Sequence, residues 1–585
     1  MFSFLRGKVR FTNEWEGPLA ASSHMKERSM SENLKKPNPV SRRSFLKTSV
    51  AKGAAGVAAA AVGLHPKEAE AANSITWHRS ADVVVVGAGV SGLACACAAR
   101  DTGASVIMIE ENFDIGGRGI MSGGSIQLGG GHSLQKKYGT VDSADMIFAD
   151  WTRHDHPASR YSDRDIVRKF ADENAATFEF LLAHGVQFTG REQAGGGAST
   201  NAGRTYQTVE WHIPSQVIAP NRGRNGSGLV RRLEESARKS GVEILLKHSM
   251  TSIIRENPKS GRVLGITVRS NGNTINVQAR KGVYVGTGGN SGNVNFRRTF
   301  DPRLTEEYQQ ACAPYARQSG DAELMSMAIG AALWATALQT SESGAAITKT
   351  AHIGCQWGYG SLVFETDSPI FHLARATGLT VANWQDVIMV NQVGKRFWSE
   401  TDGSYKFIAA AMAYNGDPDK LNGGGPIWAI FDSDAVARER WNPKPPNVDP
   451  LYFASGATLK ELAANINNPY QKRPMPGTVL QETVERYNSF VTSGTDTDFK
   501  KPKPMYKIEK PPFYAAWATP ILHDSLTGLR VNTDQQVIDI HGQVIPGLYC
   551  GGESMGGLAQ HGLGRDLVSG RIAGLHAGKS KSIKV

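Results

Sequence analysis

Short apolar runs bounded by glycines mark the chain from residue 82 onwards. Asp82–Gly92 reads DVVVVGAGVSG, and its four consecutive valines are typical of a strand buried on both faces of a parallel sheet. The small-residue stretch that follows, up to Gly103, predicts a helix, and Ala104–Ile109 predicts a second buried strand. This strand–helix–strand order predicts a βαβ unit and therefore an α/β fold.

The pattern weakens further along but still predicts elements as far as residue 330. Residues 140–190 read as helical and are followed by a strand-like VQF. The later elements are a helix at Leu229–Lys239, strands at Val242–Leu246, Thr251–Glu256 and Arg262–Arg269, a strand through Val283, and a helix that opens at Gly320–Asp321. Thr251–Glu256 and Arg262–Arg269 are predicted strands of a β-meander that closes on the strand through Val283.

From about residue 346 to 515 the glycine-rich pattern disappears, which indicates a separate domain. Ile388–Glu400 predicts a strand, a turn at Gln392–Gly394 and a return strand. The other predicted elements here are a helix from Lys406, a strand over 426–431, and helices at Leu459–Ile466 and Val479–Asn488.

Glycine spacing gives the first strand a candidate chemistry. Gly87, Gly89 and Gly92 fall in the G-x-G-x-x-G pattern of dinucleotide-binding folds. There the first glycine makes the tight turn, the second lets backbone approach a pyrophosphate, and the third lets helix pack on strand. The second strand ends at Glu110, about 20 residues on, where an acid can hold a ribose hydroxyl. The sequence therefore predicts a dinucleotide site.

Composition excludes several classes of protein. The chain has 585 residues, enough for more than one domain, with 40% hydrophobic and 20% charged residues. Net charge is +11, but residues 1–72 hold 12 basic and 6 acidic side chains, so the remainder carries about +5. That surplus, without a dense basic run, argues against nucleic-acid binding. The five cysteines are scattered, and no C-x-x-C-H haem motif or metal-ligand cluster is present.

The N-terminal part predicts export. Residues 41–72 contain Ser41–Lys47 (SRRSFLK), a twin-arginine pattern, then a weakly apolar Ala/Gly stretch and a small-x-small cleavage site at Ala69–Ala71. The stretch is too short and too polar for a membrane anchor. We expect a periplasmic enzyme without stable membrane insertion. Residues 1–40 are an expected disordered leader, and the start codon is open between Met1, Met25 and Met30.

More glycine clusters follow the βαβ unit, and together they carry a family resemblance. They are Gly116–Gly117–Arg118, Ser122–Gly123–Gly124, Gly129–Gly131, Gly282–Asn290 (GVYVGTGGN) and Gly547–Glu553 with GLGRDLVSGRIAG. Over Ala81–Gly574 the chain resembles the FAD-dependent fumarate reductase / 3-ketosteroid Δ1-dehydrogenase flavoproteins. The resemblance implies a Rossmann-type, glutathione-reductase-like FAD-binding domain with an inserted α+β capping domain. It implies FAD-binding segments at 78–345 and 516–578 and a cap at 346–515.

The cofactor is expected to be non-covalent FAD, because no His-containing attachment motif is seen. The motifs and the resemblance together give the candidate cofactor-binding residues: Gly87, Gly89, Val90, Ser91, Gly92, Glu110, Glu111, Gly116, Gly117, Arg118, Ser122, Gly123, Gly124, Thr287, Gly288, Gly289, Asp321, Glu553, Arg565, Leu567 and Val568. Arg565 begins a helix whose dipole is expected to face the edge of the flavin that becomes anionic on reduction.

The catalytic candidates also rest on the resemblance. The fumarate reductases place an Arg after the strand-turn-strand motif, whereas this chain reads WSETDGSYKF, with Ser404 and Tyr405 there. This resembles the dehydrogenase branch, in which a Tyr removes a proton α to a carbonyl. Tyr514, in PPFYAAW, matches a Tyr that binds the enolate oxygen, with Gly528 a weaker candidate. His523 corresponds to a substrate-binding His of the fumarate reductases, and packed hinge residues are the plain alternative for these positions.

The expected activity is α,β-dehydrogenation of a cyclic ketone or 3-ketosteroid-like substrate, with Tyr405 as base and hydride transfer to the flavin. One alternative is a fumarate-reductase-like ene-reductase of an unsaturated acid or enone, and another is a non-catalytic flavoprotein electron carrier. The expected partners are a small carbonyl substrate and an external cytochrome or quinone that accepts or donates electrons. If Tyr405 is not the proton partner, Arg396, His523, His561 and Arg565 are the next candidates.

Overall fold

The computed structural model of this chain describes most residues after the leader. The described residues are 75–153, 161–190, 202–211, 225–335, 345–358, 366, 368, 370–402, 404–412, 425–560 and 562–583. The chain divides into two compact units, Met1–Asn73 and Ser74–Val585, and all described residues belong to the second. The predicted signal segment therefore lies outside the described residues.

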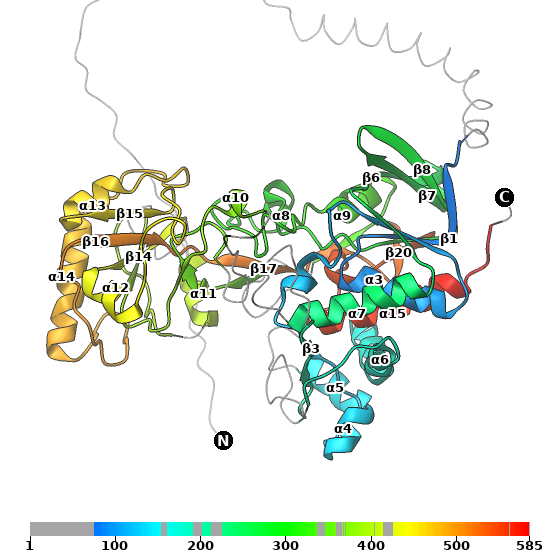
Figure 1. Cartoon of the computed structure of the whole chain (residues 1–585), viewed down its shortest axis with the longest axis horizontal. Coiled ribbons are helices and arrows are strands. Elements are labelled where there is room, and N and C mark those ends of the chain that lie inside the picture. The colour runs from blue at the N-terminus through cyan, green and yellow to red at the C-terminus, as the bar shows by residue number, and fades with distance from the viewer. Residues whose placement is uncertain are drawn as a thin grey trace, which may run out of the picture. The chain divides into compact units, whose positions relative to one another are not determined.

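An eight-stranded sheet forms the centre of the part that holds the glycine-rich motifs (Figure 1). Its core is parallel, because the valine run of β1 (Arg79–Val86) pairs in parallel with β2 (Val106–Glu110) and with β8 (Asn273–Val285). The sheet continues through β5 (Glu243–Leu246) on one side and β20 (Val544–Cys550) on the other. Each of Val83–Val86 is buried, as the apolar run predicts for a central strand.

Strands far apart in sequence meet in this sheet. β19 (Gln536–Ile538) adds antiparallel to β20 at one edge. The predicted meander is present as β6 (Ser249–Asn257) and β7 (Ser260–Ser270), which lead antiparallel into β8. Because β20 comes near the C-terminus, the sheet is complete only after the chain has formed the intervening region 286–543.

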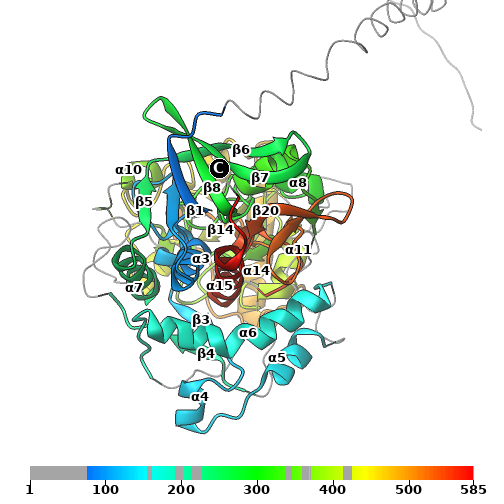
Figure 2. The same cartoon turned by 90° about the vertical axis from the view of Figure 1, so that its right-hand side faces the viewer.

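Helices α3 (Val90–Asp101), α7 (Asn225–Lys239) and α15 (Leu563–Lys579) run side by side against the sheet (Figure 2). Small residues allow this packing. A Cβ placed on Gly574 of α15 would lie 2.2 Å from the Cys95 carbonyl oxygen, and one on Gly570 would lie 2.1 Å from that of Ser91. All five cysteines are buried and unbridged. Cys95 and Cys97 therefore serve packing.

A smaller layer packs beneath α15. The predicted helical region holds α4 (Ser133–Tyr138), α5 (Ala144–Trp151) and α6 (Arg164–Ala183), and α6 contacts α15. Short strands β3 (Ser125–Gln127) and β4 (Thr205–Gln207) pair beside them. The expected VQF strand is wrong as a full strand, because Phe188 makes only an isolated bridge to Thr208.

The region between residues 388 and 517 has its own core. A four-stranded antiparallel sheet is built from β13 (Ile388–Asn391), β14 (Ile427–Phe431), β16 (Phe513–Trp517) and β15 (Phe453–Gly456), in that order. Around it are α11 (Ser404–Met412), α12 (Ser433–Glu439), α13 (Leu459–Asn465) and α14 (Gly477–Ser493). Two apolar clusters fill the two faces of the sheet.

The expected return strand after Gly394 is wrong. Only an isolated bridge joins Val390 to Arg396, and the chain continues as an irregular loop. Two causes are visible. The Asn391 side chain accepts the backbone N–H groups of Val393 and Lys395, which closes a turn instead of a ladder. Arg396 also turns its side chain into a buried ion cluster.

A short two-stranded sheet carries the candidate residue His523. β10 (Ala345–Thr348) pairs antiparallel with β17 (Ile521–Ser525), so that Ala346 lies opposite Asp524. β17 is the first strand after β16 and carries His523. Among the described helices, none is both long and apolar enough to traverse a bilayer.

Candidate active site

The glycine-rich turn after β1 has the geometry that a pyrophosphate needs. Gly87 has φ +96°, and a Cβ there would lie 2.3 Å from the Gly286 carbonyl oxygen. Gly89 is the N-cap of α3, and no side chain caps this helix. A Cβ on Gly89 would meet no protein atom within 4 Å, so this backbone faces open space. The uncapped N–H groups of α3 are therefore available to an anion.

This turn opens into a cavity. Thirteen of the predicted cofactor residues line it: Gly87, Gly89, Val90, Ser91, Glu110, Glu111, Gly116, Gly117, Arg118, Thr287, Gly288, Asp321 and Glu553. Gly92 lies outside it and serves packing, since a Cβ there would be 1.9 Å from the Gly87 carbonyl oxygen. Gly289 is also outside it, against the Ser525 side chain.

Glu110 stands at the end of β2, on the wall of this cavity. Its carboxylate oxygens accept the backbone N–H groups of Ala88 at 2.8 Å and Asn112 at 2.9 Å. Burial raises the pKa of Glu110 to about 7, against these two hydrogen bonds. Each oxygen keeps a second lone pair, so the group can still accept a hydroxyl from a ribose.

A second cavity adjoins the first. The two share Arg118, Gly119, Glu553 and Asp566. The remaining lining of the second cavity is Ser122, Gly123, Gly124, Ser125, Gln127, Cys312, His523, Asp524, Gly562, Leu563 and Gly564. The predicted residues Ser122, Gly123, Gly124 and His523 therefore share one space, at the start of α15.

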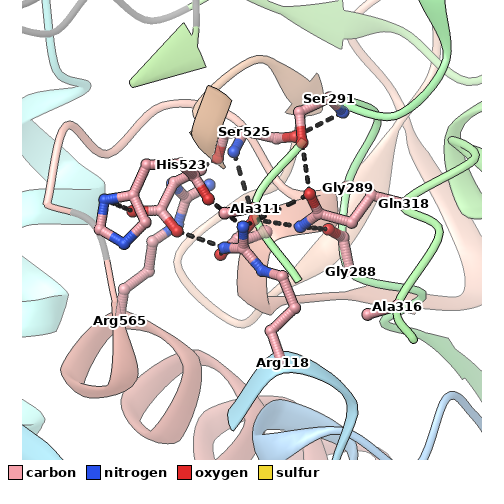
Figure 3. Close-up of polar contacts among 12 residues, drawn as sticks. Arg118, Gly288, Gly289, Ser291, Ala311, Ala316, Gln318, His523, Ser525 and Arg565 are labelled. Atoms are coloured by element: carbon pink, nitrogen blue, oxygen red, sulfur yellow. Dashed lines mark hydrogen bonds and ion pairs between the residues drawn. The ribbon is translucent and has the colours of Figure 1, made fainter. Parts of the chain in front are cut away.

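Arg118 joins the segments around both cavities (Figure 3). Its guanidinium pairs with the carboxylates of Asp524 and Glu553 and donates to the backbone carbonyl of His523. Gln318 donates to Glu553 Oε2 at 2.8 Å and contacts Arg118 Nη1 through its own Oε1 at 3.4 Å. Burial lowers the pKa of Arg118, but the carboxylates of Glu553 and Asp524 raise it by more. The net pKa lies above the ordinary value for arginine, so the side chain stays charged.

His523 is the predicted catalytic residue that the structure places in the second cavity. Its side chain is 26% exposed, and Nδ1 lies 3.5 Å from Asp524 Oδ2. His523 can therefore bind or protonate an oxygen of a small molecule in this cavity.

Arg565, on the last helix, is a predicted cofactor residue that borders neither cavity. It is fully buried, and its guanidinium donates to the backbone carbonyls of Met555, of Ser525 at 3.4 Å and of Gln560 at 3.5 Å. The start of α15 itself lines the second cavity through Gly562, Leu563 and Gly564, and its expected position at the flavin edge stays a prediction. Leu567 and Val568 are core residues as well, because α15 turns these positions towards the interior.

The two predicted tyrosines do not meet in a described site. The Tyr514 ring stacks on Phe431, with ring centroids 5.4 Å apart, in the antiparallel sheet of the cap. It lines neither cavity, and its expected role as enolate binder gains no support. Tyr405 is the second residue of α11, and its side chain lies outside the described part of the chain.

Sequence reasoning missed Asp566, which borders both cavities. Burial raises the pKa of Asp566 to about 7, although Arg565 opposes this. Its Oδ1 atom is buried without a hydrogen-bond partner among the described residues. The signal was an acidic residue in the first turn of α15, directly after Arg565. Gln318 and Cys312 had no recognisable signal, because each comes from a loop far from the glycine motifs.

These features fit FAD. The uncapped start of α3 suits a pyrophosphate, Glu110 suits a ribose, and the orphaned Asp566 carboxyl oxygen suits the hydroxyl groups of a ribityl chain. The second cavity then provides room for a ring system and a substrate. Fold and site together define a flavoprotein oxidoreductase.

The comparison with known proteins agrees. The chain belongs to the family described as "FAD binding domain", whose model matches residues 82–564. A vinyl phenol reductase of Lactiplantibacillus plantarum is 25% identical over 533 residues, which cover 86% of this chain and 97% of the relative. A fumarate reductase (cytochrome) of Shewanella frigidimarina is 26% identical over 521 residues, covering 88% and 79%.

The fold is similar to that of a solved flavoprotein structure. The solved structure of a 3-ketosteroid Δ1-dehydrogenase from Sterolibacterium denitrificans matches with a TM-score of 0.63 and 21% identity, over 86% of this chain and 99% of that one. The predicted α/β flavoprotein fold and the predicted family are confirmed. The chain is an FAD-dependent oxidoreductase that acts on C–C single or double bonds.

Proposed function

We propose that this enzyme reduces a C=C bond conjugated to a carbonyl or carboxylate group, using electrons from an external donor. One observation carries the proposal: a second cavity holding His523 adjoins the FAD cavity and shares Arg118 and Glu553 with it. The vinyl phenol and fumarate reductases add weight, because their names denote reduction. In this proposal residues 346–515 form the cap over the substrate.

FAD, when bound, supplies a hydride equivalent. The residues of the chain do the rest. His523 binds the carbonyl or carboxylate oxygen that gains electron density as the β-carbon receives the hydride. A proton then goes to the α-carbon, so that the C=C bond becomes two C–H bonds and two electrons leave the cofactor. We assign that proton to Tyr405, which begins α11 in the cap.

The reverse reaction is the second candidate, in which a cyclic ketone loses its α-proton to Tyr405 and a β-hydride to the cofactor. Two observations favour it: the loop Glu400–Tyr405 (ETDGSY) has a Tyr in place of an Arg, and the fold resembles a ketosteroid dehydrogenase. A phenol needs help to act as a base at neutral pH, because its ordinary pKa is about 10. A proton donor has no such difficulty, so we favour reduction.

Parallel assays in both directions test the proposal. The FAD-loaded enzyme is supplied with a reduced artificial donor and a panel of enoates and enones, and separately with an artificial acceptor and cyclic ketones. We expect turnover with the donor, and a loss of about 10²–10⁴-fold in His523→Ala on the best substrate. Turnover only with the acceptor would select the second candidate. No turnover in either direction would remove both.

We also propose periplasmic export through the twin-arginine pattern at Arg42–Arg43. Exporting a folded protein suits an enzyme that loads FAD before it leaves the cytoplasm. Replacing both arginines with lysine should leave the precursor in the cytoplasm with its flavin bound. A fully processed double variant in the periplasm would contradict this location.

A further inference from the structure

Lys349 occupies a distinctive position between two segments of the proposed site. It follows directly after β10, the strand that pairs with the His523-bearing strand β17. Its Nζ donates a hydrogen bond to the backbone carbonyl of Glu400, the residue before the segment 401–405. The half-buried Lys349 side chain therefore links the strand that holds His523 to the segment that leads to Tyr405.

Aromatic rings enclose the ammonium group. Nζ lies 3.5 Å from the ring centroid of Trp384 and 5.3 Å from that of Phe407 on α11. Each ring face attracts a cation and does not attract a neutral amine in the same way. The protonated form of Lys349 therefore holds the first turn of α11 more firmly than the neutral form does.

The surrounding charges limit how easily Lys349 stays protonated. Nearby, Arg396 and Lys501 face Glu400 and Asp496, at 2.9 to 3.2 Å, so two cations already balance two anions. Burial lowers the pKa of Lys349 to about 7; Lys501 lowers it as well, while Glu400 and Asp402 raise it. With Asp402 counted, three anions face the three cations Lys349, Arg396 and Lys501, so burial is the main cause of the lowered pKa of Lys349.

We propose that Lys349 is a positioning residue, which in its protonated form holds the start of α11 against the β10–β17 strands and so aligns the proton partner with His523. This inference rests on the proposed function for its catalytic consequence. Its structural consequence, the hold on α11, does not depend on the substrate. The two can therefore be tested separately.

The first test uses hydrogen exchange of backbone amides in the FAD-loaded protein. In Lys349→Met the amides of 404–412 should exchange about 10-fold faster, because one charge-assisted hydrogen bond and one cation–π contact are lost. Lys507→Met, at an exposed lysine of the cap, is the matched control. In the wild type, the same amides should lose protection between pH 6 and 8 beyond the intrinsic pH effect, whereas Lys349→Arg should not. Equal exchange in all variants would overturn the proposal.

The second test is the pH profile of kcat/KM on a substrate found by the assays above. The wild-type value should fall as the pH rises through about 7, because the hold on α11 weakens as Lys349 loses its proton. Lys349→Arg should keep its activity to higher pH, and Lys349→Met should be about 10-fold slower at pH 6 without this limb. A wild-type profile in Lys349→Met would overturn the catalytic role. If no substrate is turned over at all, the proposed function fails and the exchange experiment alone decides about Lys349.

Discussion

The part of the chain around the FAD cavity and the proposed cap are built by different means. Around the FAD cavity, backbone conformation shapes the site: Gly87 adopts a positive φ, Gly89 leaves space, and α3 begins without a capping side chain. In the cap, a buried cluster of side chains fixes the loop before α11. There Arg396 pairs with Glu400 and with Asp496 at 2.9 Å, and Lys501 Nζ lies 3.2 Å from Glu400 Oε2.

The difference has an energetic side. A glycine carries no charged side chain, so a side chain introduced at a glycine of the FAD turn disturbs only its immediate surroundings. A buried ion cluster is costly to assemble and even more costly to break, because each lost partner leaves an uncompensated charge. We therefore expect substitutions in the FAD turn to change ligand affinity and substitutions in the cap cluster to change stability.

The largest expected effect tests whether the cap carries chemistry as well as structure. Tyr405→Phe removes one hydroxyl group, so the fold and FAD binding should be preserved. If Tyr405 supplies or takes the α-proton, kcat should fall about 10²–10⁴-fold with little change in KM. Steady-state kinetics on the best alkene measure this. A near-normal rate would move the proton role to His523 or another group.

The next effect concerns the ion cluster. Glu400→Gln leaves Arg396 and Lys501 without their shared anion, and should lower the free energy of unfolding by about 3–5 kcal/mol. Urea unfolding followed by tryptophan fluorescence measures this. Glu482→Gln, at an exposed position of α14, is the control and should change stability by less than about 0.5 kcal/mol. A variant as stable as the control would mean that the cluster does not hold the cap.

Low pH should reveal the contribution of Glu400 to stability as well. Burial alone would raise the pKa of Glu400, but Lys501 and Arg396 lower it to about 2, from an ordinary value of 4.5. A depressed carboxyl pKa contributes stability in full above pH 4.5, and that contribution is lost as the pH falls towards 2. The stability gap between wild type and Glu400→Gln should therefore narrow below pH 4.5. A gap that stays constant down to pH 3 would contradict this assignment.

The smallest expected effect concerns Gly89, in the glycine-rich turn of the FAD cavity. A side chain on Gly89 meets no protein atom but enters the cavity, so Gly89→Ala and then Gly89→Val should weaken FAD binding in steps, up to about 10–100-fold. Urea unfolding of the FAD-free protein should change little in either variant. Equal FAD affinity in Gly89→Val and wild type would show that the cofactor does not approach this turn.

The same contrast explains what the sequence could predict. The glycine spacing and the valine run led to the α/β fold and to most of the FAD cavity, because local conformation carries that information. Tyr514 was a site candidate through its resemblance to an enolate-binding Tyr, but β16, which carries it, pairs with β14 and β15, and its ring stacks on Phe431. Gln318, Asp566 and Lys349 gain their roles only when distant segments meet, which no local pattern reveals.

One measurement tests the central claim most directly. The flavin of the FAD-loaded enzyme is reduced chemically without oxygen, and the enzyme is then mixed in a stopped-flow instrument with an enoate or an enone. We predict that at least one alkene restores the oxidised flavin absorbance in a saturable phase, and that this phase is at least about 10²-fold slower in His523→Ala. Reduced flavin that persists with every alkene, while a saturated cyclic ketone bleaches the oxidised enzyme, would contradict reduction as the function.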